Sequence, residues 1–484
     1  MTRDESAETS PAIAGFHPDP TICRVGEDYY VAMSSFEYSP SVPIWHSRDL
    51  QTWTLLANAL DRDSQFQSAR SRAGGGIWAP TLRHHAGRFW LITTDSDSQR
   101  GQRLFMADAP EGPWSEAVEI PELVGIDPDI AWTQDGRCLV TYCAWNDEGA
   151  GIRQAEIDPH TGRALTEPQW IWRGTGLSHT EAPHLVQRND WWYLFVAEGG
   201  TERGHVVSVA RSRAPHGPFV PAPEEPLYTH RSTDHPVQNV GHLDVVQSSD
   251  GSWVGVHLGV RARGITPGFH TNGREVFLVD VAWIDDWPVI RPSSISFKSE
   301  RWDFQESFTS ESLHPRWISP AARPETFCQP GSDGLQVWAS DTSGLYVRVQ
   351  PLHWEAAFEM SASDAVAVVE VRVDDRHRFG ARISGGGVQA LLTIGGVEVD
   401  IGPQVPHDGW VAIGSVPSAT GGPDDLVVLA GSGRSTLAVV DGRYLSTEVV
   451  GGFSGRVVGI RTESGIAMLR SFRLHELDSS AARL

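Results

Sequence analysis

The chain has 484 residues, of which 40% are hydrophobic and 21% are charged. This length exceeds one ordinary hydrophobic core and predicts two domains, and the composition is that of a globular protein. The net charge of −22 argues against nucleic acid as a partner, because phosphate binding needs a basic surface. It suits a neutral ligand such as a sugar. No apolar run is long enough to cross a bilayer, so we expect no membrane partner.

The N-terminal segment MTRDESAETS is polar and acidic, and lacks the basic and apolar regions of a secretory signal. The four cysteines, Cys23, Cys138, Cys143 and Cys328, form no CxxC pair and no metal-ligand spacing. Cys138 and Cys143 share one apolar stretch, and in a strand they would be too far apart for a disulfide. These features predict a cytoplasmic protein with reduced thiols.

Short β-rich runs separated by Gly, Pro and Asp turns fill the chain as far as VAWIDDWPVIRPSS. A turn residue followed by aromatic and aliphatic residues recurs as GEDYYVAMSS, GRFWLITTDS, GRCLVTYCAW, NDWWYLFVAEG and GSWVGVHLGV. A second hairpin signal, such as ADAPEGPW, follows several copies, which indicates four strands per unit. Five such units predict a five-bladed β-propeller over residues 10–295. A long irregular β-sandwich is the alternative.

Pro288 and Pro292 mark a boundary, beyond which the pattern of apolar and polar residues changes. Runs such as HWEAAFEMSA and AVAVVEVRVDD alternate apolar and polar residues, as half-buried antiparallel strands do. Residues 300–476 therefore predict a β-sandwich of the jelly-roll, concanavalin-like kind, so the whole chain is expected to be all-β. This part contains no catalytic motif and is expected to be structural or accessory.

Candidate acids stand at the beginnings of three predicted blades. Asp19 lies between two prolines in FHPDPT, Asp127 precedes a proline in GIDPDIAW, and Glu181 lies in SHTEAPHLV. Taken singly, each is also typical of an ordinary turn residue. The innermost strands of a propeller converge on one channel, so three acids at equivalent places favour a site with paired carboxyl groups. Glu181 stands among aromatic residues and few cations, which suits a general acid with a raised pKa.

Further side chains could complete such a site. His242 in QNVGHLDVVQ holds the corresponding place in the fifth blade, and Arg274 stands beside the last apolar strand. A buried Arg274 would need an acidic partner or a hydroxyl-bearing ligand. Phe36 and Trp78 fall in proline-containing loops, where an aromatic ring can stack on a sugar face. Each of these four is also compatible with a purely structural role.

The ordered set of phrases FHPDP, SSFEYSP, GGIWAPTL, GIDPDI, TEAPHL, VQNVGH and GREVFL resembles glycoside hydrolase family 43. Within it, the chain is similar to the β-xylosidase branch that carries a C-terminal β-sandwich. The resemblance is close over residues 11–295 and looser through WDFQESFTSESLHPRW. It implies that Asp19 is the general base, that Glu181 is the general acid, and that Asp127 orients the acid and raises its pKa.

The resemblance also implies a binding subsite for the terminal pentose, built from Phe36, Trp78, Thr201 and Arg274. His242 matches a histidine at the channel floor, which in some relatives lies near a bound calcium ion. A metal is not required by the expected chemistry, so no cofactor is expected beyond such a structural calcium. In relatives the sandwich also supplies an aromatic that closes the pocket, a residue that cannot be placed from the sequence.

Three positions depart from the family pattern: Asp129 and Leu243, where smaller residues are usual, and Ala182, where glycine is usual. Asp129 could compete for the role of Asp127 or face solvent, and Leu243 could alter the channel floor. None of these changes removes a catalytic carboxylate.

These features together predict an exo-acting, inverting glycosidase that releases terminal xylose from short β-1,4-xylo-oligosaccharides. Its two catalytic carboxyls are expected roughly 6.5–9.5 Å apart, with water between Asp19 and the sugar. An α-L-arabinofuranosidase, or an enzyme active on both sugars, is the nearest alternative. A non-catalytic carbohydrate-binding propeller or an interaction propeller is less favoured, because a binding protein has no need of all three acids. The sandwich offers surface for self-association, so a homo-oligomer is one expectation.

Overall fold

The computed structural model describes residues 9–67, 71–98, 100–147, 149–295, 297, 302–340 and 343–478. Strands dominate this part of the chain, and the helical elements η2 (Pro324–Thr326), η3 (Gly442–Leu445) and α2 (Thr447–Val450) are short. Within the described residues, no helix is long and apolar enough to cross a membrane. The predicted all-β class is therefore confirmed.

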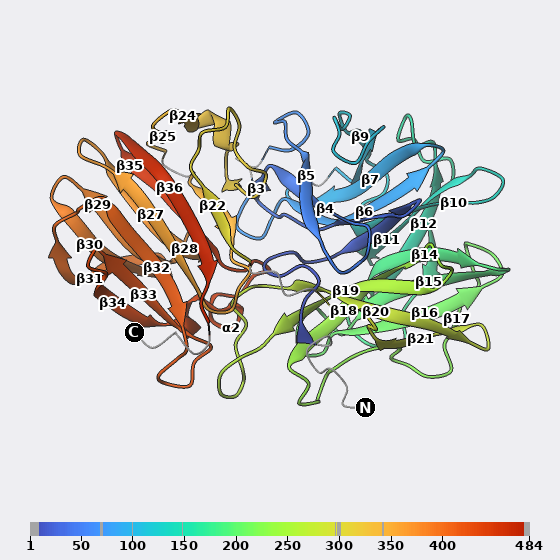
Figure 1. Cartoon of the computed structure of the whole chain (residues 1–484). Coiled ribbons are helices and arrows are strands. Elements are labelled where there is room, and N and C mark those ends of the chain that lie inside the picture. The colour runs from blue at the N-terminus through green and yellow to red at the C-terminus, as the bar shows by residue number, and fades with distance from the viewer. Residues whose placement is uncertain are drawn as a thin grey trace.

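The N-terminal part of the chain folds into five antiparallel sheets of four strands each (Figure 1). The first two sheets consist of β1 (Thr21–Val25), β2 (Asp28–Ala32), β4 (Ser41–Ser47) and β5 (Thr54–Leu60), then β6 (Ile77–His85), β7 (Arg88–Asp95), β8 (Gln102–Ala107) and β9 (Val118–Ile120). The third consists of β10 (Ile126–Trp132), β11 (Cys138–Asn146), β12 (Gly149–Ile157) and β13 (Gln169–Trp172). The last two consist of β14 (Glu181–Arg188), β15 (Trp191–Glu198), β16 (Val206–Ser212) and β17 (Val220–Pro221), then β18 (Val237–Gln247), β19 (Trp253–Arg261), β20 (Glu275–Ile284) and β21 (Trp287–Pro292).

The five sheets are arranged in a ring. The first strand of each sheet contacts the first strand of the next, and β18 of the fifth sheet contacts β1 of the first. A separate hydrophobic cluster fills the space between each neighbouring pair of sheets. The cluster that closes the ring packs Val31 of β2 and Val256 of β19 together. The recurring aromatic phrase of the sequence is the second strand of each sheet.

An unusual backbone conformation lies just before or near the beginning of four first strands, and within the fifth, β18. The residue at this place has a positive φ in all five sheets: Asp19 (57°), Ala79 (37°), Asp127 (54°), Ala182 (51°) and His242 (54°). Non-glycine residues rarely adopt this conformation, and where they do they often lie at functional sites. In four of the sheets the strand register also shifts here, as at a β-bulge, which re-aims the side chains.

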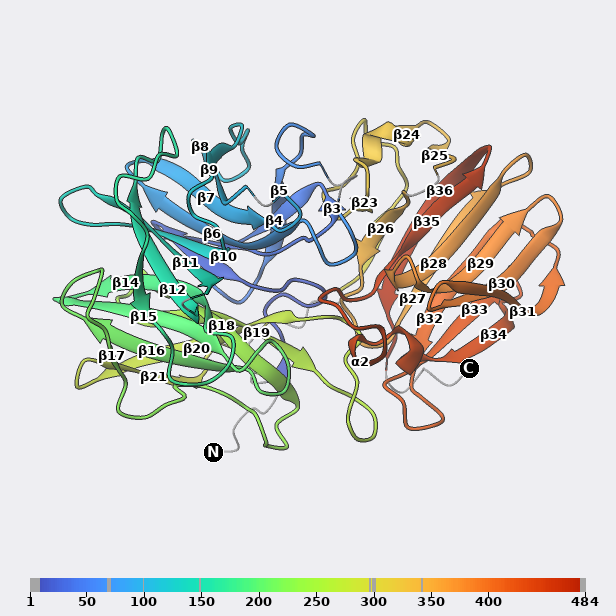
Figure 2. The ribbon, with the colours of Figure 1, turned by 180° about the vertical axis from the view of Figure 1, so that it is seen from behind.

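The C-terminal part forms two further sheets (Figure 2). One large hydrophobic cluster lies between them. One has eight strands: β22 (Phe304–Glu306), β24 (Cys328–Gly331), β25 (Gly334–Trp338), β27 (Trp354–Ser361), β32 (Trp410–Val416), β33 (Asp425–Ala430), β34 (Ser435–Asp441) and β36 (Ile466–Glu476). The second has six: β26 (Leu345–Arg348), β28 (Val366–Asp374), β29 (His377–Ser384), β30 (Gly387–Ile394), β31 (Val397–Val405) and β35 (Val457–Ser464).

The two parts of the chain are joined by polar and apolar contacts. Strand β3 (Tyr38–Ser39) pairs with β23 (Ser319–Pro320), and the Asn272 side chain donates to the backbone oxygen of Gln350 at 2.9 Å. A buried cluster that includes Phe16 and Tyr346 spans the same interface. The predicted boundary around residues 290–300 falls partly on residues outside the described ones. These contacts place the C-terminal part beside the ends at which the first strands of the five sheets begin.

The four cysteines are buried, and none of them is paired in a disulfide. Cys138 and Cys143 lie on the same strand, β11, which keeps their side chains apart.

Candidate active site

A small pocket lies where the first strands of the ring begin. Its volume is about 90 Å³. All eight side chains that the sequence singles out line it, together with four more. The lining residues are Asp19, Phe36, Trp78, Ile126, Asp127, Glu181, Thr201, His205, His242, Leu258, Arg274 and Phe453.

Asp19 is the most strongly held carboxylate of the pocket. It is buried, accepts a hydrogen bond from the Ser34 hydroxyl at 2.6 Å, and accepts another from Nη1 of Arg274 at 2.8 Å. Burial alone raises the pKa of Asp19, but the Arg274 charge and the Ser34 hydroxyl outweigh it, so that the pKa lies below its ordinary value. Asp19 is therefore ionised at neutral pH.

Glu181 and Asp127 have the opposite electrostatic character. Burial and the nearby Asp19 charge raise the pKa of Glu181 to about 7. Burial, Glu181 and Asp19 raise the pKa of Asp127 well above its ordinary value. The Asp127 carboxylate also accepts a hydrogen bond from the backbone N–H of Ala182 at 3.1 Å. The pocket thus holds one ionised carboxylate and a coupled pair that retains a proton near neutral pH.

Arg274 connects the ionised acid to the rest of the pocket wall. It is buried just before β20, and its Nη1 also donates to the Thr201 hydroxyl at 3.1 Å. Asp19 is thus the acidic partner that a buried Arg274 needs. The guanidinium leaves further N–H donors for a hydroxyl-bearing ligand.

Three aromatic rings form the apolar wall. The rings of Phe36 and Phe453 are stacked, with centroids 6.0 Å apart and an interplanar angle of 11°. Trp78 meets Phe453 edge-on at 5.6 Å, and its Nε1 donates to the backbone oxygen of Gly74 at 3.0 Å. Trp78 lies on strand β6 rather than in a loop as predicted, since the strand begins one residue before it.

Sequence reasoning missed four pocket residues, Ile126, His205, Leu258 and Phe453, of which Phe453 alone comes from the C-terminal part. It follows α2 in the C-terminal part and is 37% exposed. Its segment, GGFSG, has the composition of an ordinary exposed turn, and nothing local marks it as facing a pocket almost 180 residues from the last predicted site residue. The only signal is one aromatic flanked by glycines.

Two histidines line the pocket beside Asp19. Nδ1 of His242 lies 3.7 Å from Oδ1 of Asp19, and burial lowers the pKa of His242 to about 3. Nδ1 of His205 lies 2.9 Å from the backbone oxygen of Asn239, and burial lowers the pKa of His205 to about 4. Both imidazoles are therefore neutral at pH 7, so they add hydrogen-bonding groups but no charge.

Residues 8–288 match the family model described as glycosyl hydrolases family 43, which is more than half of the chain. The chain belongs to glycosyl hydrolases family 43. This confirms the family resemblance, and membership makes the protein a glycosidase.

Relatives within family 43 cover different shares of the chain. A non-reducing end alpha-L-arabinofuranosidase of Bacteroides ovatus is 32% identical over 491 residues, which is 93% of this chain and 90% of that protein. A xylosidase/arabinosidase of Butyrivibrio fibrisolvens is 39% identical over 295 residues, which is 58% of this chain and 56% of that protein. The crystal structure of xylan beta-1,4-xylosidase from Bacillus halodurans has a TM-score of 0.85 and 28% identity, and the match covers 97% of this chain and 100% of that one.

The structure corrects two predictions, one about the surroundings of Asp129 and one about the place of Glu181 in its strand. Asp129 neither faces solvent nor reaches the pocket: it is fully buried, and its carboxylate lies 2.7 Å from Nη2 of Arg83. Glu181 is not at the place equivalent to Asp19 and Asp127, because Ala182 is the residue with positive φ in its sheet. Glu181 enters the pocket from one residue earlier, beside the register shift between Glu181 and His184.

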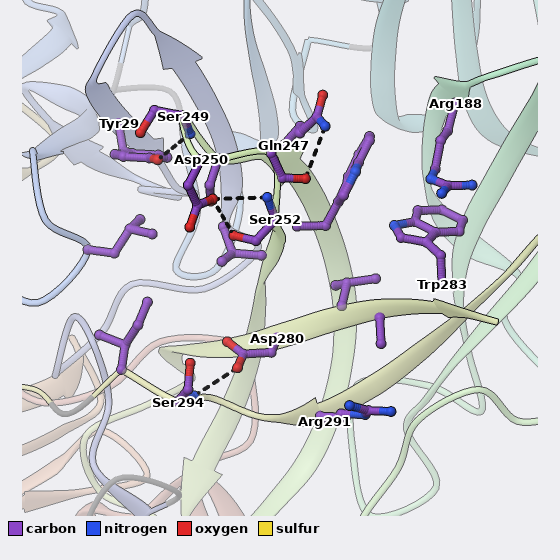
Figure 3. A pocket seen from close by; sticks show the side chains of 18 of the residues that line it. Tyr29, Arg188, Gln247, Ser249, Asp250, Ser252, Asp280, Trp283, Arg291 and Ser294 are labelled. Atoms are coloured by element: carbon purple, nitrogen blue, oxygen red, sulfur yellow. Dashed lines mark hydrogen bonds between the residues drawn. The ribbon is translucent and has the colours of Figure 1, made fainter.

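A larger hollow, of about 870 Å³, lies elsewhere in the five-sheet part, along the β18–β19 turn and β20 (Figure 3). Its carboxylates Asp250 and Asp280 accept hydrogen bonds from serines in neighbouring turns. Asp250 accepts from the backbone N–H of Ser252 at 2.9 Å and from its hydroxyl at 2.7 Å, and Asp280 accepts from the backbone N–H of Ser294 at 3.0 Å (Figure 3). The pKa of Asp250 is lowered by the Ser252 hydrogen bonds. The pairing of an ionised and a proton-retaining carboxyl belongs to the small pocket, which is the candidate active site.

Proposed function

We propose that this family 43 protein is an exo-acting, inverting β-xylosidase that releases terminal D-xylose from short β-1,4-xylo-oligosaccharides. The observation that carries the proposal is the opposite electrostatic character of Asp19 and Glu181 in one small pocket. Hydrolysis with inversion requires one ionised carboxylate to activate water and one protonated carboxyl to protonate the leaving oxygen. The lowered pKa of Asp19 and the pKa of about 7 for Glu181 match these two tasks.

In the proposed reaction, Glu181 donates its proton to the glycosidic oxygen as the bond from that oxygen to the anomeric carbon breaks. A water molecule attacks the anomeric carbon from the opposite face and loses a proton to Asp19. The products are a sugar of inverted anomeric configuration and a shortened oligomer. Asp19 then releases its proton and Glu181 regains one from solvent. Asp127 supports the acid through its position beside Glu181 and its hydrogen bond from Ala182.

The wall of the pocket supports binding of one terminal sugar. Its volume of about 90 Å³ is small beside the roughly 300–1,000 Å³ of clefts for drug-sized ligands, and suits a single pentose unit. We assign Phe36, Trp78 and Phe453 to the apolar face of the sugar and Arg274 and Thr201 to its hydroxyls. A pocket of this size, bounded by Phe453 from the C-terminal part, favours removal of units from a chain end.

We also infer the architecture that presents this pocket. The ring of five four-stranded sheets supports a five-bladed β-propeller over residues 10–295. The two sheets around one hydrophobic cluster support a β-sandwich over residues 300–476. The four free, buried cysteines support a cytoplasmic enzyme that receives short oligosaccharides.

An α-L-arabinofuranosidase is the second candidate. The observation that favours it is the arabinofuranosidase of Bacteroides ovatus, which aligns over 93% of this chain. Xylose and arabinose present similar hydroxyls, and the same carboxyl pair would serve both.

The test is hydrolysis of xylotriose and of 4-nitrophenyl α-L-arabinofuranoside by the purified protein, compared through kcat/KM. We expect xylose and xylobiose as the first products of xylotriose, and at least tenfold lower kcat/KM on the arabinofuranoside. The reverse preference would replace the β-xylosidase proposal with the arabinofuranosidase. Activity on neither compound would contradict both.

A further inference from the structure

A buried ion network lies beneath the pocket and takes one side chain from the first strand of every sheet. Its members are Thr21 (β1), Arg83 (β6), Asp129 (β10), His184 (β14) and Asp244 (β18). Thr21, Asp129 and Asp244 are fully buried, His184 is 2% exposed, and the Arg83 side chain is 18% exposed.

Arg83 is the centre of this network. Its Nη2 lies 2.7 Å from Oδ1 of Asp129, and its Nη1 lies 2.7 Å from Oδ2 of Asp244. Nη1 also donates to the Thr21 hydroxyl at 3.0 Å, and Nη2 lies 3.2 Å from Nδ1 of His184. A guanidinium only donates, so Nδ1 of His184 is the acceptor in this contact. One planar cation therefore joins all five first strands.

The lowered pKa of Asp244 shows how strongly Arg83 stabilises the charge of this carboxylate. Burial raises the pKa of Asp244, but the charge and the hydrogen bonds of Arg83 outweigh it, and the pKa falls to about 2. The Thr21 hydroxyl and the backbone N–H of Ile22 also donate to the Asp244 carboxylate, at 2.7 and 2.9 Å. Removing the cation would leave two buried carboxylates unpaired, which is strongly destabilising.

Short stretches of backbone connect the network to the pocket. Thr21 follows Asp19 by two residues, Asp129 follows Asp127 by two, and Asp244 follows His242 by two. His184 likewise follows the acid Glu181 by three residues on β14. A second link runs through side chains. The rings of His184 and His242 are 5.6 Å apart, and Nδ1 of His242 lies 3.7 Å from Asp19. A shift of the network would therefore move the base, the acid, the acid's neighbour and His242 together.

We propose that Arg83 is a positioning residue: its guanidinium is the built-in cation that ties the five first strands together and thereby sets the placement of the pocket carboxyls above them. The part of this proposal that concerns catalysis rests on the function proposed above. The structural part does not.

The calcium ion that the family resemblance implies near His242 does not fit this place. Arg83 engages Oδ1 of Asp129, both carboxylate oxygens of Asp244 and Nδ1 of His184, and the backbone N–H of Leu185 donates to Oδ2 of Asp129. Nε2 of His184 has no hydrogen-bond partner among the described residues, but it carries the ring proton when Nδ1 accepts, so it is not free to bind an ion. Within the described ranges, no group of three or more His, Cys, Asp or Glu side chains is arranged to hold a metal ion. Calcium prefers six to eight oxygen ligands, which this network does not supply.

The first experiment needs no activity. Thermal unfolding of the full chain is followed after dialysis, with EDTA and with millimolar calcium chloride. Metal content is measured on the dialysed protein. We expect a Tm that differs by less than about 2 °C among the three conditions, with far less than one calcium per chain. One calcium per chain together with a Tm lowered by EDTA would overturn the assignment of Arg83 as the cation.

The second experiment compares Arg83→Lys with Arg83→Met and with the control Arg88→Met, which lies on the same hairpin but 45% exposed. Lysine keeps the charge but loses the planar fork that bonds both carboxylates. We expect Arg83→Met to lose much of its folded yield. Arg83→Lys should fold with a Tm lowered by several degrees, and Arg88→Met should match the parent.

The decisive readout on Arg83→Lys is the ratio of kcat on 4-nitrophenyl β-D-xyloside to kcat on xylobiose. This ratio is independent of the folded fraction. The nitrophenyl group needs little protonation, so misplacement of Glu181 slows xylobiose more. We expect the ratio to rise about tenfold. An unchanged ratio in a folded Arg83→Lys protein would overturn the positioning role. A parent enzyme inactive on both substrates would instead contradict the proposed function and leave the calcium experiment as the test of the network.

Discussion

Asp19 and Arg274, 255 residues apart in the chain, form a buried ion pair in which Nη1 of Arg274 lies 2.8 Å from Oδ1 of Asp19. The pair keeps Asp19 ionised although burial opposes its charge. The same Arg274 charge lowers the pKa of Glu181, against the larger effects of burial and Asp19. One guanidinium therefore acts on both carboxyls of the proposed reaction.

Removing this charge should move the whole pH profile. In Arg274→Met, the pKa of both Asp19 and Glu181 rises, so both limbs of the bell-shaped profile of kcat/KM shift to higher pH. We also expect kcat/KM to fall about 100-fold or more, because the sugar loses a hydrogen-bond donor. The control is Arg203→Met, whose side chain is 44% exposed beside Glu448. A profile that keeps its limbs in Arg274→Met would contradict the electrostatic role of Arg274.

The parent enzyme should lose activity as the pH rises through about 7, because Glu181 must be protonated and its pKa is about 7. The acid limb should lie below the ordinary carboxyl value, since the pKa of Asp19 is lowered. The basic limb belongs to the coupled Glu181–Asp127 pair rather than to one group alone. The measurement is kcat/KM on xylobiose from pH 3 to 9. A flat profile between pH 6 and 9 would speak against Glu181 as the acid.

Replacing Glu181 should lower kcat by different factors on different substrates, according to how much each leaving group needs protonation. In Glu181→Gln, we expect kcat on xylobiose to fall roughly 10²–10⁴-fold, the usual contribution of general acid catalysis. The loss on 4-nitrophenyl β-D-xyloside should be smaller, because that leaving group needs little protonation. Glu224→Gln, at an exposed glutamate, is the matched control. Equal losses on the two substrates would argue that Glu181 has another role.

Phe453 should contribute to binding rather than to the chemical step. Phe453→Ala removes the ring that stacks on Phe36 and meets Trp78 edge-on. Because aromatic contacts of this kind contribute about 0.5–1.5 kcal/mol beyond the buried area, we expect KM to rise about tenfold with kcat changed less than threefold. Val449→Ala, on the same segment and 47% exposed, should leave both constants unchanged. A large fall in kcat without a change in KM would contradict this assignment.

Much of the fold could be predicted because its signals are local. The turn-and-aromatic phrase recurs at each second strand, and alternation of apolar and polar residues marks the C-terminal strands. The pocket carboxyls could be singled out for a related reason. Asp19 and Asp127 each stand before a proline at the start of a repeated unit. Their positive φ could not be predicted, because a residue before proline ordinarily favours extended backbone.

The rest depends on contacts between distant segments. The sequence predicts Asp129 near the pocket or in solvent, and its true partner, Arg83, is identifiable only once two first strands lie side by side. Phe453 reaches the pocket through the docking of the C-terminal part, and no local pattern encodes that docking. The sequence also predicts that Glu181 is equivalent to Asp19 and Asp127, whereas the next residue, Ala182, holds that place. An alanine in the sequence does not indicate a positive φ, so this difference of one residue could not be predicted.

The central claim is that Asp19 activates water while Glu181 protonates the leaving oxygen, in a single displacement. Proton NMR of the first seconds of xylotriose hydrolysis tests it most directly, because the anomeric signal of newly released xylose is resolved before mutarotation. The account predicts that α-xylose appears first and β-xylose follows by mutarotation. Release of β-xylose first would mean retention of configuration, and would contradict the assignment of Asp19 as the base.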